Sequence, residues 1–214
     1  MNLLELRSFV RERLDDEVTP YQWSDTFINA AINRAEREAA ERALLLKDYS
    51  QIIAVTAGNT DYDIPLSTIV IDRLSIGNNV LVKTNEVELD SIFSDWESLT
   101  NEPKFYIQDG YKVRLVGIPD ADYTIKLSIT RRPLSKLIDD ADTPEIDEEY
   151  HEFLMFQVLY EAYSRRDEDL YDPNAAQMNM LEFTNIFGQK RSAKFMSAVK
   201  RHRTGSRVYP RRFV

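Results

Sequence analysis

The sequence contains two histidines, His151 and His202, the residue type best suited to move a proton near neutral pH or to bind a transition metal. Cysteine is absent, so the sulfur ligands of a structural zinc site are missing. A catalytic zinc site needs about three protein ligands, which only histidine and carboxylates could supply here. We interpret His151 as a structural or surface residue on a helix and His202 as a solvated residue among arginines, and we predict no metal site.

Acidic side chains gather between Asp139 and Glu149, which raises the question of calcium binding. An EF-hand loop needs a ligand at its fifth position and glycine at its sixth. In a loop that starts at Asp140, these positions hold Pro144 and Glu145, so the segment does not fit. Helix capping and a solvated linker explain the acids better, and a weak surface cation site is the alternative left open.

Signatures of catalysis and of nucleotide binding are missing from the sequence. Carboxylate pairs such as Asp167 with Asp169 are common among 36 acids and are not specific for acid–base chemistry. There is no Gly-x-Ser-x-Gly elbow and no cysteine nucleophile, and the six glycines never cluster into a phosphate-binding loop. We therefore predict that the protein is not an enzyme, with no catalytic residues and no cofactors.

Charge is divided unevenly along the chain, whose net charge is −9. Residues 183–214 hold nine of the 27 Lys and Arg and none of the 36 Asp and Glu, which leaves residues 1–182 at −18. Such asymmetry favours a partner of opposite sign for the basic end, although chance composition of a solvated terminus is the plain alternative. Nucleic acid is one candidate partner, but an acidic body repels phosphate within about 10 Å. A protein with an acidic docking surface suits the segment at least as well.

Apolar periodicity predicts two helices toward each end of the chain and strands between them. One helix is expected over residues 2–14, and a second begins after the N-cap Ser24 and runs to about Lys47. A third is expected from Asp147 and a fourth over residues 173–188, with Pro173 in its first turn. These four elements should pair to bury their apolar faces.

The middle of the chain has the two-residue alternation of strands. Asp109-Gly110 lies between two alternating segments and supplies the positive φ values of a tight hairpin turn. We expect residues 104–132 to form a three-stranded meander. Earlier strands are expected over residues 52–56, 69–76 and 80–83.

These expectations combine into an α+β fold: a four-helix body with an inserted antiparallel β lobe and an extended basic C-terminal tail. The predicted boundaries are 1–50 for the N-terminal helices, 51–133 for the lobe, 134–199 for the C-terminal helices and 200–214 for the tail. Apolar runs extend over only a few residues, such as 153–156, whereas a membrane-spanning helix needs about 20. No membrane partner is expected.

Several short motifs follow one another along the chain in an order typical of one protein family. They are Leu6-Arg7-Ser8-Phe9-Val10-Arg11, Trp23-Ser24-Asp25, Ile32-Asn33-Arg34-Ala35-Glu36-Arg37-Glu38, Ala57-Gly58 with Tyr62, Ile64 and Pro65, Pro119-Asp120-Ala121, Arg132-Pro133, and residues 142–146 with Tyr150-His151 and Leu154. Each motif alone is weak, but their order and spacing over residues 3–190 give a stronger signal. Together they resemble the head-to-tail adaptor (connector) proteins of podovirus-type tailed bacteriophages.

This resemblance implies a structural virion protein at the head–tail junction, present in the host cytoplasm during assembly. In that family a dodecameric ring docks beneath the portal, with the helical body forming the ring and the β lobe projecting outward or down. The C-terminal segment grips the portal. A downstream tail tube or nozzle protein attaches below, as do tail fibres in some cases. DNA passes through the channel during ejection without specific binding.

Two hypotheses join the resemblance to the charge pattern. Part of the acid excess in the helices lines the channel, where like charge keeps DNA from sticking. The basic end docks on the portal through charge-assisted hydrogen bonds and buried aromatic rings. The docking residues inferred are Arg201, Arg203, Arg207, Tyr209, Arg211, Arg212 and Phe213. The alternative function is a DNA-binding accessory protein that uses the same basic arm.

Overall fold

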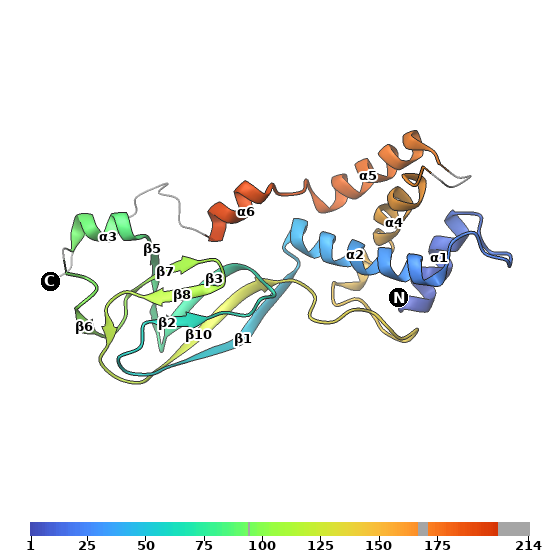
Figure 1. The fold of residues 1–214 in the computed structure, drawn as a ribbon. Coiled ribbons are helices and arrows are strands. Elements are labelled where there is room, and N and C mark those ends of the chain that lie inside the picture. Colours follow the sequence, from blue (N-terminus) through green and yellow to red (C-terminus); the bar gives the residue numbers. More distant parts are fainter. Residues whose placement is uncertain (94, 167–170, 201–214) are drawn as a thin grey trace. The chain divides into compact units, whose positions relative to one another are not determined.

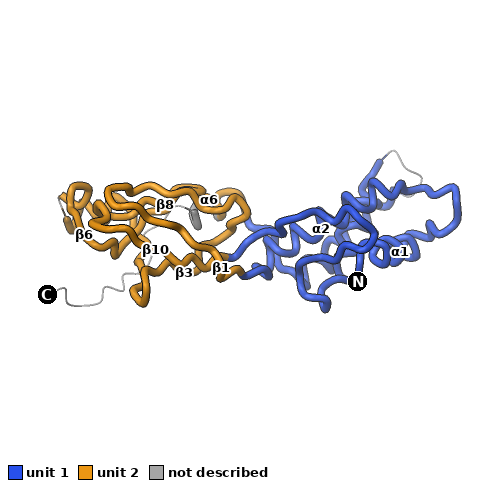
Figure 2. Tube along the Cα trace, turned by 90° about the horizontal axis from the view of Figure 1, so that it is seen from below, with its two compact units in different colours: residues 1–47, 130–191 blue, residues 48–129, 192–214 orange. Residues whose placement is uncertain are grey.

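A computed structural model of the chain describes residues 1–93, 95–166 and 171–200 (Figure 1). It divides into two compact units (Figure 2): unit 1 comprises residues 1–47 and 130–191, and unit 2 comprises residues 48–129 and 192–214. Helices combined with sheets rich in antiparallel pairs confirm the α+β class. The predicted domain boundaries, the four-helix body and the extended basic tail remain predictions, and most of the tail lies outside the described residues.

Unit 1 is helical, and its elements are α1 (Leu3–Arg13), α2 (Asp25–Ala43), the 3-10 turn η1 (Glu148–Tyr150), α4 (Leu154–Tyr163) and α5 (Pro173–Phe187). Three of its helices, α1, α2 and α5, begin at side chains that cap free backbone N–H groups. Asn2 and Glu5 form a capping box on α1, each side chain accepting from the other's backbone N–H at 2.9 Å. Ser24 accepts from the Phe27 N–H at 3.2 Å, as predicted.

The core of unit 1 is shared by its two chain segments, which are far apart in sequence. Alanines line the buried face of α2, and such small side chains allow a neighbouring helix to approach closely. From the second segment, α4 and α5 bring their apolar faces onto the same cluster. The core includes Leu3, Leu6, Val10, Ile28, Ala31, Ile32, Ala35, Leu154, Val158, Phe183 and Phe187.

Two predicted helix boundaries in unit 1 are wrong. The second helix ends at Ala43 rather than near Lys47, because Leu44 adopts a left-handed conformation with φ 56° and the chain then enters a strand. The third helix begins at Leu154, since the acids after Asp147 form only a 3-10 turn and the Asp147 side chain accepts no capping hydrogen bond.

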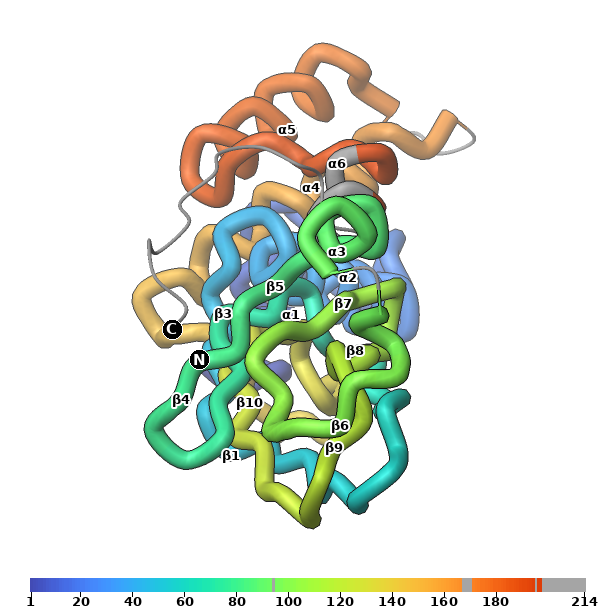
Figure 3. Tube along the Cα trace, turned by 90° about the vertical axis from the view of Figure 1, so that its left-hand side faces the viewer, coloured from blue at the N-terminus to red at the C-terminus, as the bar shows by residue number. Residues whose placement is uncertain are grey.

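Unit 2 consists mainly of two four-stranded sheets, whose ends are seen in Figure 3. The first has the order β1 (Leu46–Val55), β10 (Tyr123–Arg131), β3 (Thr68–Ile76), β4 (Asn79–Val80). The second has the order β2 (Asp61–Asp63), β8 (Lys112–Leu115), β7 (Phe105–Asp109), β5 (Val82–Thr84). Apolar side chains from both sheets, including Leu74, Val113, Ile125 and Leu127, form one buried cluster.

Short elements complete unit 2. They are the parallel pair β6 (Thr100–Asn101) and β9 (Ile118–Pro119), and the helices α3 (Glu86–Ile92) and α6 (Ala193–Lys200). The helix α3 was not predicted, although Asn85 caps it by accepting from the Glu88 N–H at 2.9 Å. It escapes pattern analysis because it is short and buries a single residue, Leu89.

The hairpin at Asp109-Gly110 is confirmed, but the three-stranded meander is wrong. Gly110 has φ 62°, and β7 and β8 pair in antiparallel register around it. The next strand, β10, lies in the other sheet between β1 and β3. The chain changes sheets near Gly117 (φ 81°), where a Cβ atom would lie 2.8 Å from the Leu99 carbonyl oxygen. Alternation of apolar residues identifies a strand, but it does not identify the strand's neighbours.

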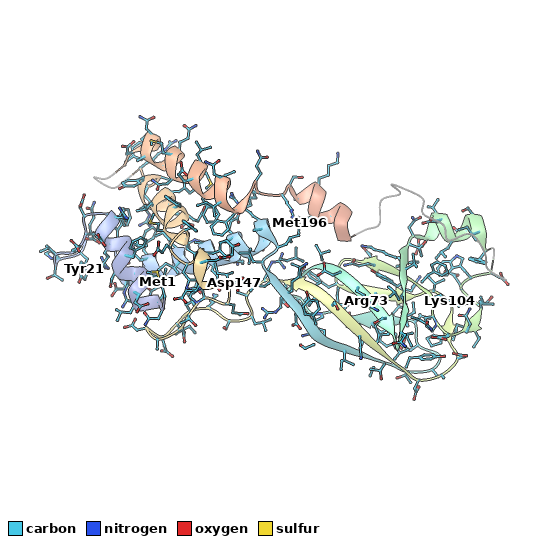
Figure 4. All side chains as sticks on the ribbon, turned by 180° about the vertical axis from the view of Figure 1, so that it is seen from behind. Met1, Tyr21, Arg73, Lys104, Asp147 and Met196 are labelled. Atoms are coloured by element: carbon cyan, nitrogen blue, oxygen red, sulfur yellow. The ribbon has the colours of Figure 1, made fainter. Side chains whose placement is uncertain are left out.

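A buried ion pair fixes the loop between α1 and α2, which carries Tyr21 at one end of unit 1 (Figure 4). Arg11 contacts the Asp16 carboxylate at 2.5 Å and donates to the Trp23 carbonyl at 2.8 Å and to Asp25 at 2.7 Å. Asp16 also accepts the backbone N–H groups of Gln22 and Trp23. Both partners are buried, so each charge depends on the other for compensation.

We expect Arg11→Met to lower the free energy of unfolding by about 3–5 kcal/mol, because it leaves the Asp16 carboxylate buried without a counter-charge. Arg13→Met, at an exposed position of the same helix, is the control and should change stability by no more than about 0.5 kcal/mol. Urea unfolding followed by circular dichroism measures both. Equal effects of the two substitutions would contradict this role of Arg11.

Candidate interaction surfaces

The residues predicted to dock on a partner lie outside the described part of the chain. Described structure ends at Lys200, the last residue of α6, whereas Arg201, Arg203, Arg207, Tyr209, Arg211, Arg212 and Phe213 follow it. The same holds for His202 and for Asp167 with Asp169. The candidate surfaces described below therefore belong to unit 1, and the structure neither gathers nor separates the predicted docking residues.

The helix α5 is firmly attached to unit 1. Asp172 caps its start by accepting from the N–H groups of Asn174 and Ala175, and Gly188 ends it with φ 83°. On its inner side, Phe183 and Phe187 are buried with ring centroids 4.7 Å apart. Arg42 of α2 lies over the Phe183 ring and donates to the Gly188 carbonyl at 3.1 Å.

The outward side of α5 is unusual in having almost no charge. We call Asn174, Gln177, Met178, Leu181, Glu182 and Asn185 the outer face of α5; all six are exposed. Met178 and Leu181, three residues apart and therefore adjacent on the helix, are 68% and 57% exposed. The whole helix has one charged residue in 15, whereas α2 has seven in 19. Depletion of charge with an exposed methionine is typical of the centre of a protein interface.

A second surface is formed by the segment that returns from unit 2, which we call the return segment (residues 132–146). Asn33 of α2 accepts from the Leu137 N–H at 2.8 Å and donates to its carbonyl at 3.0 Å. Leu134 and Ile138 of this segment are nevertheless 67% and 77% exposed. The return segment and α5 lie on opposite sides of α2 (Figures 1 and 4). Unit 1 thus carries exposed aliphatic side chains on two opposite sides.

Most of the acids on α2 are bound within unit 1 and do not face solvent freely. Glu38 contacts Arg42 and Lys190, and Glu41 contacts Arg132 at 2.5 Å. On the return segment, Asp142 accepts the N–H groups of Ile138 and Asp139, which lowers its pKa. These capping and pairing contacts support the interpretation of the acidic run as structural. Other acids in or next to this run are exposed: Asp139, Asp147, Glu148, Glu149 and Glu152.

Glu36 is a buried carboxylate between α2 and the return segment. It is 1% exposed and accepts the Glu145 N–H at 2.6 Å. Burial raises its pKa to about 7, against the lowering effect of the backbone bonds and with a further contribution from the nearby charge of Glu145. Glu145 itself is desolvated, but Arg131 and the N–H groups of Leu134 and Ser135 outweigh this, and its pKa is lowered.

The placement of His151 supports a structural interpretation. It is buried, with Nε2 2.9 Å from the Ile146 carbonyl oxygen and Nδ1 3.0 Å from the amine of Met1. Among the residues that the structure describes, no three histidine or carboxylate side chains are arranged to hold a metal ion. No helix within the same residues is long and apolar enough to cross a bilayer.

We expect Glu36 to make the protein less stable as pH rises from about 5 to 8. Its folded pKa of about 7 exceeds the usual value of 4.5, so between these pH values the folded state holds a proton that the unfolded state has released, and the unfolding free energy falls until it levels off above pH 7. Glu36→Gln should reduce the fall in unfolding free energy by about 2–3 kcal/mol. Urea unfolding at the two pH values measures this. The exposed substitution Glu12→Gln should retain the wild-type fall, and an E36Q variant that did so too would refute the assignment.

Comparison with known protein families gives one match that spans nearly the whole chain. The family described as SU10 adaptor protein matches residues 1–209, which include both units and most of the basic end. No curated protein sequence matches this chain.

Proposed function

Because the chain belongs to the SU10 adaptor protein family, a family of bacteriophage structural adaptors, we propose that it forms the ring that joins the portal to the tail. Membership implies a virion component that associates with other phage structural proteins. The match over residues 1–209 carries the proposal. The ring is dodecameric and encloses the channel through which DNA leaves the head.

The proposed partners lie above and below this ring at the head–tail junction. The portal binds on one side. A downstream tail tube or nozzle protein binds on the other, and tail fibres are a further partner. As a structural adaptor, the protein works by shape and charge complementarity, without a cofactor and without sequence-specific binding of DNA. Assembly takes place in the host cytoplasm.

The basic end is proposed to grip the portal through Arg201, Arg203, Arg207, Tyr209, Arg211, Arg212 and Phe213. Support comes from its composition, since residues 183–214 contain nine cations and no acid. Guanidinium groups form charge-assisted, bidentate bonds with carboxylates, and aromatic rings supply buried area. Those features fit an acidic, partly apolar groove on the partner.

The channel lining is proposed to be acidic. The sequence alone leaves every acid of the helices as a candidate for this lining, whereas the structure favours a smaller group. The α2 acids are occupied in ion pairs and backbone hydrogen bonds, which favours the exposed acids at 147–152. Like charge prevents phosphate contacts from holding the DNA. In a reconstructed ring, Asp and Glu should therefore outnumber Lys and Arg along the lumen. A basic lumen would disprove this lining.

Deletion of residues 204–214 should lower affinity for the cognate portal at least about 100-fold, since several interface anchors are removed together. The charge reversals Arg207→Glu, Arg211→Glu and Arg212→Glu should act in the same way. A matched triple variant, Lys104→Glu, Lys112→Glu and Lys126→Glu, reverses exposed cations of unit 2 and should bind normally. Analytical ultracentrifugation with purified portal measures binding, and circular dichroism checks the fold.

The same proteins test the alternative of a DNA-binding accessory protein, which the cation-rich end favours. That function requires tight binding of duplex DNA by the free protein, weakening steeply with salt and lost on deletion of residues 204–214. An adaptor should bind DNA weakly at about 0.15 M salt. Tight, salt-sensitive binding to DNA with no binding to portal would replace the adaptor proposal by this alternative.

A further inference from the structure

Unit 1 carries exposed aliphatic side chains on two opposite sides: Met178 and Leu181 on the outer face of α5, and Leu134 and Ile138 on the return segment. We infer that neighbouring copies associate head to tail through them, with the outer face of α5 in one copy packing on Leu134 and Ile138 of the return segment in the next. This inference rests on the proposed ring and assigns its subunit contact. The occupant of each surface is thus a second copy of this chain.

The first step is that the outer face of α5 has the composition of an interface. Met178 and Leu181 are adjacent, more than half exposed, and surrounded by Asn174, Gln177 and Asn185. In a chain with 29% charged residues, a 15-residue helix with only Glu182 charged is exceptional. A helix face that remained in water would tolerate charge at these positions, whereas the centre of an interface excludes it.

The second step is that a closed ring needs two different surfaces on each subunit. A self-complementary surface gives a dimer, but a heterologous contact repeated around an axis gives a ring. The outer face of α5 and the return segment lie on opposite sides of α2, as a head-to-tail contact requires (Figures 1 and 4). Both surfaces belong to unit 1, so their separation is fixed within one compact body.

The third step is that exposed charges of both signs border the two surfaces and can orient the contact. On the return segment, Ile138 lies between the exposed Lys136 and the exposed acids Asp139 and Asp140. Next to α5, the exposed cations are Arg165, Arg166 and Lys190, whose ammonium group also contacts Glu38, and Asp172 is an exposed acid at the start of the helix. Such peripheral charges fix orientation and suppress wrong pairings, while the aliphatic side chains supply the buried area.

Both surfaces are also held in position before any contact forms. Arg42 and the buried phenylalanines fix α5, and Asn33 binds both backbone groups of Leu137 in the return segment. Asp142 further fixes the backbone beside Ile138. A preformed surface loses little conformational entropy on association, which favours a specific contact from modest area.

Cysteine cross-linking can test the contact because the chain has no natural cysteine. Met178→Cys and Ile138→Cys are made singly and together, assembled with portal, and treated with a short bismaleimide. The double variant should give a ladder of multimers, and a mixture of the two single variants should give dimers. Either single variant alone should remain monomeric on denaturing gels. Val18→Cys combined with Met178→Cys is the control: Val18 is 81% exposed in the α1–α2 loop of unit 1, outside both proposed surfaces, and no ladder is expected.

A second measurement uses charge to disrupt the contact. Met178→Asp with Leu181→Asp should reduce ring formation at least tenfold, counted by electron microscopy, with the melting temperature unchanged. Val87→Asp, at a position of unit 2 that is 79% exposed, should leave ring formation intact.

The outcomes separate this contact from the adaptor function. Rings that form without cross-links, or Met178→Cys linking to itself, would overturn the head-to-tail contact while the adaptor function stands. Failure of the wild-type protein to form rings on the portal would overturn both.

Discussion

Unit 1 closes only when the return segment docks on α2, and a few polar contacts decide where it docks. Asn33 binds both backbone groups of Leu137, Glu36 accepts the Glu145 N–H, and Glu41 pairs with Arg132. Each contact joins residues about a hundred positions apart in sequence. Because α4 and α5 follow directly from this segment, their positions depend on it, and with them the burial of the shared core.

Many charged side chains of this protein are engaged in contacts within the chain. Arginine and carboxylate side chains are used in pairs that hold loops and segments, as Arg11 does with Asp16 and Arg131 does with Glu145. The surface of unit 1 presents a helix face with a single charge, a segment with exposed aliphatic side chains and a group of exposed acids. Such surfaces suit recognition of other proteins, in agreement with membership of a structural adaptor family.

Local signals in the sequence predicted elements well, whereas long-range pairing did not follow from them. Ser24, Asp172-Pro173 and Asp109-Gly110 act within a few residues, and the structure has the expected cap, helix start and hairpin at each. The placement of β10 between β1 and β3 depends on strands tens of residues away in sequence. The alternation of apolar and polar residues within β10 does not identify those strands. Leu44 is a residue type that could continue a helix, yet it adopts φ 56° and ends α2 two residues before β1 begins.

Some of the candidate surfaces can be recognised from the sequence, and others only from the fold. The basic end is visible as composition, because charge is a property of the residues alone. The outer face of α5 is visible in the sequence as a single charge in 15 residues, but apolar periodicity marks the buried side of a helix and does not identify the exposed one. The role of Glu36 required the fold, since nothing local distinguishes a buried glutamate from the exposed ones around it.

The split of unit 1 across the chain also sets an order of events during synthesis. Residues 1–47 leave the ribosome before residues 130–191, so the apolar faces of α1 and α2 can pack only on each other until the second segment completes their shared core. Unit 2 lies almost wholly between these segments and can fold while translation continues. At about 5–20 residues per second, the first two helices wait on the order of ten seconds. During that interval their apolar faces are only partly covered, and the core of the helical unit closes after residues 48–129 of unit 2 have been made.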